Sequence, residues 1–117
     1  MGAPPKRSTS PVVWDTYPKP VYVEYKGQTI QAFRRGNLAL ALNRTVHTIR
    51  AMERKGVLSH PRVKDGRGHW LYTRDQIEDL VELAITENVI DPRYRNTFSQ
   101  FFIEQAHQIL QRLPRLN

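Results

Sequence analysis

The residues with evident chemistry in this sequence are basic side chains, and they are concentrated in one span. Between Arg34 and Arg74 there are ten Lys or Arg residues but only two acids, Glu53 and Asp65. This span therefore has a net excess of eight positive charges, whereas the whole chain of 117 residues carries +7. A charge excess confined to one span indicates a polyanionic partner, and we expect its binding to depend strongly on salt.

Catalytic and metal-binding patterns are not evident. The chain has no cysteine, which excludes disulfides, thiolate metal sites and cysteine nucleophiles. No nucleophile-elbow pattern is visible, and the glycines around Arg67 are too closely spaced for a nucleotide-binding loop. We expect neither an enzyme nor a bound cofactor or metal. None of the four histidines has metal-ligand spacing: His47, His60, His69 and His107.

The basic span begins with a pattern typical of two short helices joined by a tight turn. Leu38, Ala41 and Leu42 form an i, i+3, i+4 apolar stripe, which predicts the first helix. Asn43 suits the left-handed backbone that ends a helix, and Thr45 suits the N-cap of the next one.

The second helix is predicted to run from Thr45 to about Lys55 and to stop at Gly56. Val46 and Ile49 are three residues apart, so both should face the core. The residues predicted to point outward are His47, Thr48, Ala51 and Lys55, with Arg50 and Arg54 at the border.

A β-hairpin is predicted next. The β-prone runs 62–64 and 69–72 flank the glycine-bearing loop 65–68. The order helix, turn, helix, hairpin is that of a winged helix-turn-helix domain.

The runs 45–58 (TVHTIRAMERKGVL) and 68–73 (GHWLYT) resemble the MerR-type winged helix-turn-helix, a module shared with excisionases and small phage regulators. The matching positions are Thr48-Ile49-Arg50, Glu53, Gly56 and Leu71-Tyr72, within a resemblance that covers about half of the chain. The resemblance implies double-stranded DNA as the partner and a helix that enters the major groove.

Contact roles can be assigned on this basis. The helix from Thr45 would enter the groove with its N-terminal turn foremost, so His47, Thr48 and Arg50 are placed for base edges. Tyr72 resembles the family's wing tyrosine, and its hydroxyl would reach a phosphate while Trp70 or Leu71 packs inward. The remaining predicted contacts are with phosphates or the minor groove: Arg44, Thr45, Arg54 and Lys55 near the helix, and Arg62, Lys64, Arg67 and His69 in the wing.

A second hairpin is predicted ahead of this module, over residues 21–33. A two-residue turn at Lys26-Gly27 would pair Tyr25 with Gln28, Val23 with Ile30 and Val21 with Ala32. This hairpin would either extend the sheet of the wing or cover the first helix. Residues 1–20 contain five of the eight prolines and read either as a disordered basic tail or as an arm that reaches a DNA groove.

A third helix is predicted from Thr73, which forms a capping box with Gln76. Its core stripe is Ile77, Leu80, Val81 and Ala84. Asp75, Glu78, Asp79 and Glu82 share another face, which we interpret as a solvated acidic face rather than a metal site.

The last predicted helix runs from about Thr97 to Leu113 and is ended by Pro114. Its apolar stripe either closes the core of the domain or forms a homodimer or homo-oligomer surface. The stripe consists of Phe98, Phe101, Phe102, Ala106, Ile109, Leu110 and Leu113.

The sequence thus predicts an α+β fold, a winged helix-turn-helix with an N-terminal β-hairpin and an additional C-terminal helix. The predicted organisation is a Pro-rich tail (1–20), a DNA-binding domain (21–87) and an amphipathic helical segment (88–117). The function expected is that of a small phage or bacterial transcription regulator that binds DNA as a dimer in the bacterial cytoplasm. An excisionase-type architectural protein and a phage DNA-packaging small subunit are the alternatives, and neither a membrane span nor a small-molecule effector is expected.

Overall fold

The computed structural model describes residues 19–89 and 98–113, and it confirms the predicted α+β class. These residues form four helices and two small two-stranded antiparallel sheets. The predicted N-terminal tail lies outside the described residues, except for Lys19 and Pro20.

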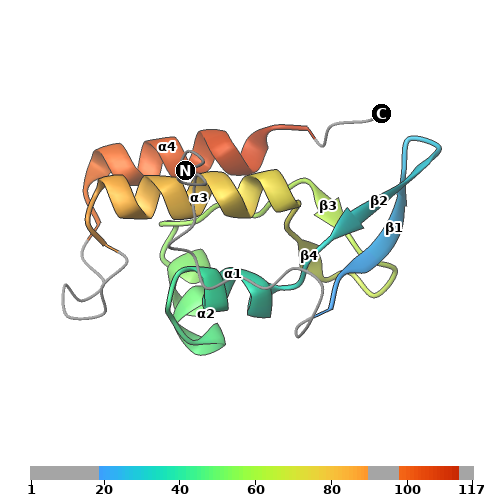
Figure 1. Ribbon diagram of the computed structural model, residues 1–117, viewed down its shortest axis with the longest axis horizontal. Coiled ribbons are helices and arrows are strands. Elements are labelled where there is room, and N and C mark those ends of the chain that lie inside the picture. Colours follow the sequence, from blue (N-terminus) through green and yellow to red (C-terminus); the bar gives the residue numbers. More distant parts are fainter. Residues whose placement is uncertain (1–18, 90–97, 114–117) are drawn as a thin grey trace, which may run out of the picture.

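Two layers of helices stand beside a pair of hairpins (Figure 1). The longer helices α3 (Arg74–Thr86) and α4 (Gln100–Gln111) lie side by side in one layer. The shorter helices α1 (Arg35–Ala41) and α2 (Val46–Arg54) lie beneath them, and both hairpins lie at the other end of the molecule from α2.

The first hairpin has the register that its sequence predicts. Strands β1 (Val21–Tyr25) and β2 (Gln28–Ala32) pair Val23 with Ile30 and Val21 with Ala32. The turn residues Lys26 and Gly27 have φ angles of 51° and 81°, both in the left-handed region that a tight two-residue hairpin turn requires.

The second hairpin is shorter than predicted, because β3 (Val63–Lys64) and β4 (Trp70–Leu71) have two residues each. A single antiparallel bridge joins the two hairpins: the N–H of Phe33 donates to the Tyr72 carbonyl at 2.7 Å, and the N–H of Tyr72 donates back at 2.8 Å. The hairpins also share a small core, in which Ala32, Val63 and Leu71 are buried. Of the two predicted roles, the first hairpin is therefore closer to an extension of the second than to a cover for α1.

The helix-turn-helix forms where it was predicted. Asn43 adopts a φ of 56° after α1, and Thr45 caps α2 by accepting the N–H of Thr48 at 3.1 Å. The prediction that Val46 faces the core is wrong, because this side chain is 37% exposed. The buried stripe of α2 begins one turn later, at Ile49, and continues with Met52, so the first turn of the helix stands clear of the core.

Helices α3 and α4 supply most of the remaining core. The capping box of Thr73 and Gln76 starts α3, and the four residues of its predicted apolar stripe are buried. Helix α4 is shorter than predicted and is capped by Ser99, while the predicted boundaries at Thr97 and Pro114 lie outside the described residues. Its inner side chains Phe102 and Leu110 are fully buried, and each large apolar side chain buried in this way contributes about 1.5–3 kcal/mol.

Candidate nucleic-acid interface

The N-terminal turn of α2 is held in a defined position. The Thr45 hydroxyl oxygen accepts the Thr48 N–H, and the two threonine hydroxyls lie 3.0 Å apart. A hydroxyl cap of this kind stabilises a helix by about 1 kcal/mol. This turn carries His47, which is exposed, and Thr48, which is half-buried.

The rest of the outward face of α2 is basic. Ile49 and Met52 are buried on the inner face, and the opposite face is open to solvent. The exposed cations on this helix and at its C-cap are Arg50, Arg54 and Lys55.

The second hairpin presents a further set of basic side chains. Lys64 on β3 pairs with Trp70 on β4, and the Lys64 Nζ is 4.3 Å from the centre of the indole ring. His60 stacks on the same ring, with centroids 4.9 Å apart, so the half-buried Trp70 anchors the segment that leads into β3. The exposed members of the predicted set are Arg62, Lys64, Arg67 and His69.

Asp65 organises the loop of this hairpin. Its Oδ1 accepts the backbone N–H groups of Arg67 at 2.8 Å and His69 at 2.9 Å. Its Oδ2 lies 3.2 Å from both the Arg34 Nη1 and the His69 Nδ1. The hydrogen bond from the His69 N–H is the main reason why the pKa of Asp65 falls to about 2, with Arg67 and the His69 ring acting in the same direction against the effect of burial.

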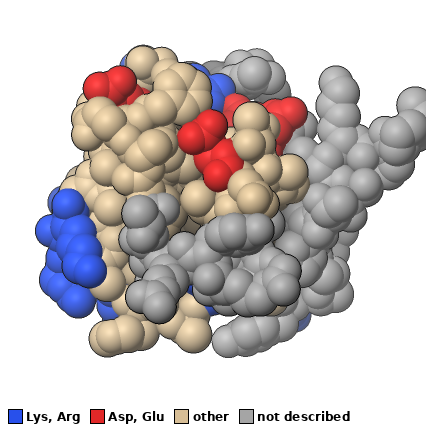
Figure 2. Space-filling model, turned by 90° about the vertical axis from the view of Figure 1, so that its left-hand side faces the viewer, with Lys and Arg blue, Asp and Glu red and all other residues tan. Residues whose placement is uncertain are grey.

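The two acids of the basic span both turn inward. The side chains of Glu53 and Asp65 are each 7% exposed and each pairs with an arginine. Figure 2 shows Lys and Arg side chains gathered low on one face, at the height of α1 and α2, while Asp and Glu side chains gather above them. The outward charge of the span is therefore positive, since its acids are withdrawn from the surface.

Residues 33–84 match the model of a protein family that is described as "MerR HTH family regulatory protein". This part of the chain belongs to the MerR-type helix-turn-helix family. The family is one of DNA-binding regulators, and the matched residues contain α1, α2, the second hairpin and most of α3. Searches of curated proteins and of solved structures found no match.

Within the MerR-type domain, the predicted phosphate contact of Tyr72 is wrong. Its side chain is fully buried, and its hydroxyl donates a hydrogen bond to the Glu53 Oε2 at 2.5 Å. Burial raises the pKa of Tyr72 well above its usual value, and the hydrogen bond to Glu53 acts in the same direction. Leu71, rather than Trp70, is the other fully buried side chain here.

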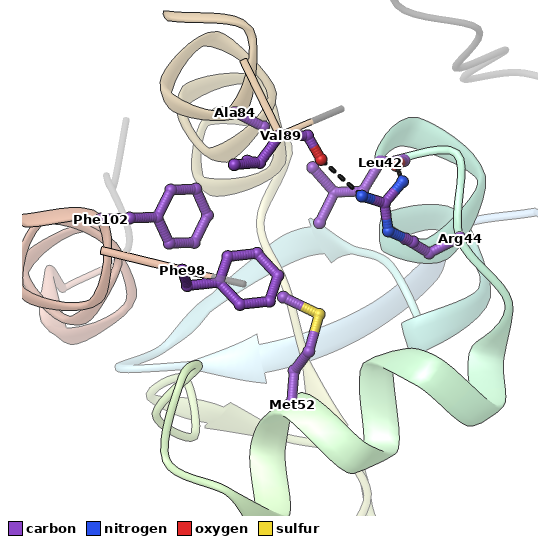
Figure 3. A pocket seen from close by; sticks show the side chains of 7 residues that line it. All are labelled: Leu42, Arg44, Met52, Ala84, Val89, Phe98 and Phe102. Carbon is purple, nitrogen blue, oxygen red and sulfur yellow. Dashed lines mark hydrogen bonds between the residues drawn. The ribbon is translucent and has the colours of Figure 1, made fainter. Parts of the chain in front are cut away.

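The predicted phosphate contact of Arg44 is also corrected, because its guanidinium donates hydrogen bonds to backbone carbonyl groups. Its Nη2 donates to the Val89 carbonyl at 2.5 Å, and its Nη1 lies within 3.3 Å of the Leu42 and Asn43 carbonyls. Figure 3 shows this arginine at the rim of an open apolar hollow between α2 and the α3–α4 layer. We therefore assign Arg44 to the contact between these layers rather than to a phosphate. The hollow is lined by Leu42, Arg44, Met52, Ala84, Val89, Phe98 and Phe102.

The acidic face of α3 pairs with nearby side chains. Asp79 accepts a hydrogen bond from the Arg112 Nη2 at 2.7 Å, and Glu78 lies 3.3 Å from the Arg74 Nε. Within residues 19–89 and 98–113, no three His, Asp or Glu side chains are grouped so that they could hold a metal ion. The same residues include no helix with the length and apolarity needed to span a bilayer.

Sequence reasoning missed the residues that hold this surface together. Arg34 and Arg35 were counted only as charge, yet Arg34 pairs with Asp65 and Arg35 pairs with Glu53. The available signal was the isolation of two acids among ten basic residues. Acids kept in a polyanion-binding span are candidates for internal ion pairs.

Proposed function

We propose that this protein is a sequence-specific transcriptional regulator of phage or bacterial origin, in which α2 reads the major groove of double-stranded DNA. The second hairpin acts as the wing. The observation that carries this proposal is the exposure of basic side chains on α2 and on the second hairpin of a MerR-type domain, where the two acids of the basic span, Glu53 and Asp65, are turned inward.

The proposed contacts follow the geometry of each element. His47, Thr48 and Arg50 lie on the outward face of the first turns of α2 and would contact base edges, with Arg50 suited to guanine. Thr45, at the N-terminus of α2, suits a phosphate. Arg54 and Lys55 would contact the backbone from the C-terminal end of α2, and Arg62, Lys64, Arg67 and His69 would do so from the wing.

We propose further that the protein binds as a homodimer through α4. The inner face of α4 is part of the main core, but Phe101 is 53% exposed and Leu113 is 50% exposed. These two apolar side chains remain available for a second copy. A dimer would recognise half-sites about one helical turn apart.

Selection of bound duplexes followed by salt-dependent affinity measurements tests the reading role. Arg50→Ala should cost about 1–3 kcal/mol on the selected site and relax specificity at one position. Arg67→Ala should weaken binding to all duplexes and reduce the salt slope by about one. Arg74→Ala, which changes an exposed arginine of α3 outside the proposed contact set, is the matched control. Unchanged affinity at low salt in both test variants contradicts the docking geometry.

Footprinting and light scattering separate this function from its alternatives. A discrete palindrome bound by a dimer supports a transcriptional regulator. An extended array of direct repeats would instead support an excisionase-type architectural protein, and a ring-sized assembly would support a DNA-packaging subunit.

A further inference from the structure

Three consecutive residues at the start of α1 connect the elements that we propose to face DNA. We call Phe33, Arg34 and Arg35 the 33–35 junction. Phe33 pairs through its backbone with Tyr72, which follows β4. Arg34 reaches Asp65 in the loop of the hairpin, and Arg35 reaches α2. One short segment therefore contacts the hairpin at its base and in its loop, as well as the reading helix.

On the α2 side, the contact is made by Glu53. Its Oε1 accepts from the Arg35 Nε at 3.0 Å and lies 2.9 Å from the Arg35 Nη2. Its Oε2 accepts the hydroxyl of Tyr72 at 2.5 Å. Both carboxylate oxygens are thus engaged, and hydrogen bonds with an ionised partner are stronger and more directional than neutral ones.

On the hairpin side, the two carboxylate oxygens of Asp65 likewise have different partners. One oxygen accepts the N–H groups of Arg67 and His69, which fixes the conformation of the loop. The other oxygen faces the guanidinium of Arg34 and so joins the loop to α1. The loop is therefore positioned relative to the helices by a side chain of the junction.

We propose that Glu53 and Asp65 are positioning residues for DNA binding, which set the placement of the wing against α2 through the 33–35 junction before DNA is met. This inference rests on the proposed binding of duplex DNA. It explains why two acids are present in a span that has ten basic residues. It also separates their contribution from simple charge, because removing an acid from a basic surface should by charge alone strengthen binding to phosphates.

The test uses variants that remove a charge or a hydroxyl but keep the shape of the side chain. Glu53→Gln, Asp65→Asn and Tyr72→Phe are compared in the full chain on a duplex selected with the unaltered protein. Glu104→Gln, which changes an exposed acid on α4, is the matched control for charge. Thermal denaturation of each variant identifies any that are not folded at the temperature of the binding assay.

If the acids position the wing, removing one of them should weaken duplex binding, whereas the change in net charge alone should strengthen it. Asp65→Asn should weaken affinity roughly threefold to tenfold, equivalent to about 0.7–1.4 kcal/mol, because the loop that carries Arg67 would have to become ordered on binding. Tyr72→Phe should act in the same direction. The salt slope should stay unchanged in both, because neither variant removes a phosphate contact, whereas Arg67→Ala should lower it by about one.

Coupling between the partners gives a second measurement. Arg35→Gln and Glu53→Gln combined should weaken binding no more than the stronger single variant, because both remove the same contact. If folded Asp65→Asn and Tyr72→Phe bind as tightly as the unaltered protein or more tightly, the positioning role is overturned, even if Glu53→Gln does not fold. If the unaltered protein binds no duplex at low salt, the proposed function fails, and the positioning role fails with it.

Discussion

The two hairpins are both antiparallel strand pairs but are stabilised in different ways. The β1–β2 hairpin has five-residue strands and a two-residue turn, so its backbone ladder and turn geometry define it. The β3–β4 hairpin has only two residues in each strand, and its loop depends on the carboxylate of Asp65. A short hairpin that must present a loop therefore uses a side chain where the longer hairpin uses paired strands.

Charge separates the two hairpins as well. In the first hairpin, Glu24 offsets Lys26, and the Glu24 carboxylate accepts the hydroxyl of Thr29 at 2.5 Å. In the second, Arg62, Lys64 and Arg67 are all exposed, and the acid beside them is turned inward. The comparison indicates that the first hairpin supports the fold, while the second is the one suited to a phosphate backbone.

The largest expected effect comes from the small core that the hairpins share. Leu71 is fully buried there, so Leu71→Ala should lower the free energy of unfolding by about 2–5 kcal/mol. Urea unfolding measures this change. Tyr22→Thr, on the exposed side of β1, is the control and should stay within about 0.5 kcal/mol. A loss below 1 kcal/mol for Leu71→Ala would mean that the hairpins do not depend on a common core.

Matched glycine substitutions sharpen the comparison. Gly27 in the first turn has a φ of 81° and Gly68 in the second loop has a φ of 86°, with open space around both. Alanine at either position should therefore cost about 1–2 kcal/mol through backbone strain alone. Only Gly68→Ala should also weaken DNA binding, since only that loop carries Arg67. Equal losses of affinity from both variants would contradict the assignment of one hairpin to the fold and the other to DNA.

The predictability of the two hairpins differs for the same physical reason. The register of β1–β2 follows from alternation and a Lys-Gly turn, which are both local, so the sequence was enough to predict it. The caps of Thr45 and Thr73 were likewise predictable because each acts within one helical turn. Contacts between residues far apart in the chain leave no local pattern.

Tyr72 and Arg44 show what was missed. Each looked suited to a phosphate from its residue type and its neighbours in sequence. Tyr72 instead meets Glu53, 19 residues away, and Arg44 meets Val89, 45 residues away. Only the packing of the layers brings these partners together. The same is true of Arg34, whose partner Asp65 is 31 residues away, and of Arg35, whose partner Glu53 is 18 residues away.

A smaller effect should appear in the pH dependence of stability. The pKa of Asp65 is lowered from 3.8 to about 2 in the folded chain, so its carboxylate stabilises the fold above pH 4. This contribution should be lost as pH falls from about 4 to about 2. Melting temperatures over this range should drop more in the unaltered protein than in Asp65→Asn. Parallel curves would show that the loop is not held by the ionised carboxylate.

The smallest expected effect concerns the tip of the first hairpin, where a substitution should leave duplex binding unchanged. Lys26→Gln and Arg67→Gln each remove one positive charge from an exposed hairpin tip. Arg67→Gln should lower the salt slope of duplex binding by about one, because a phosphate contact is lost. Lys26→Gln should leave the slope unchanged, since the β1–β2 turn lies on the opposite side of the hairpin pair from the layer that contains α2 (Figure 1). A lowered slope for Lys26→Gln would show that both hairpins contact the duplex, and the division of roles between them would be wrong.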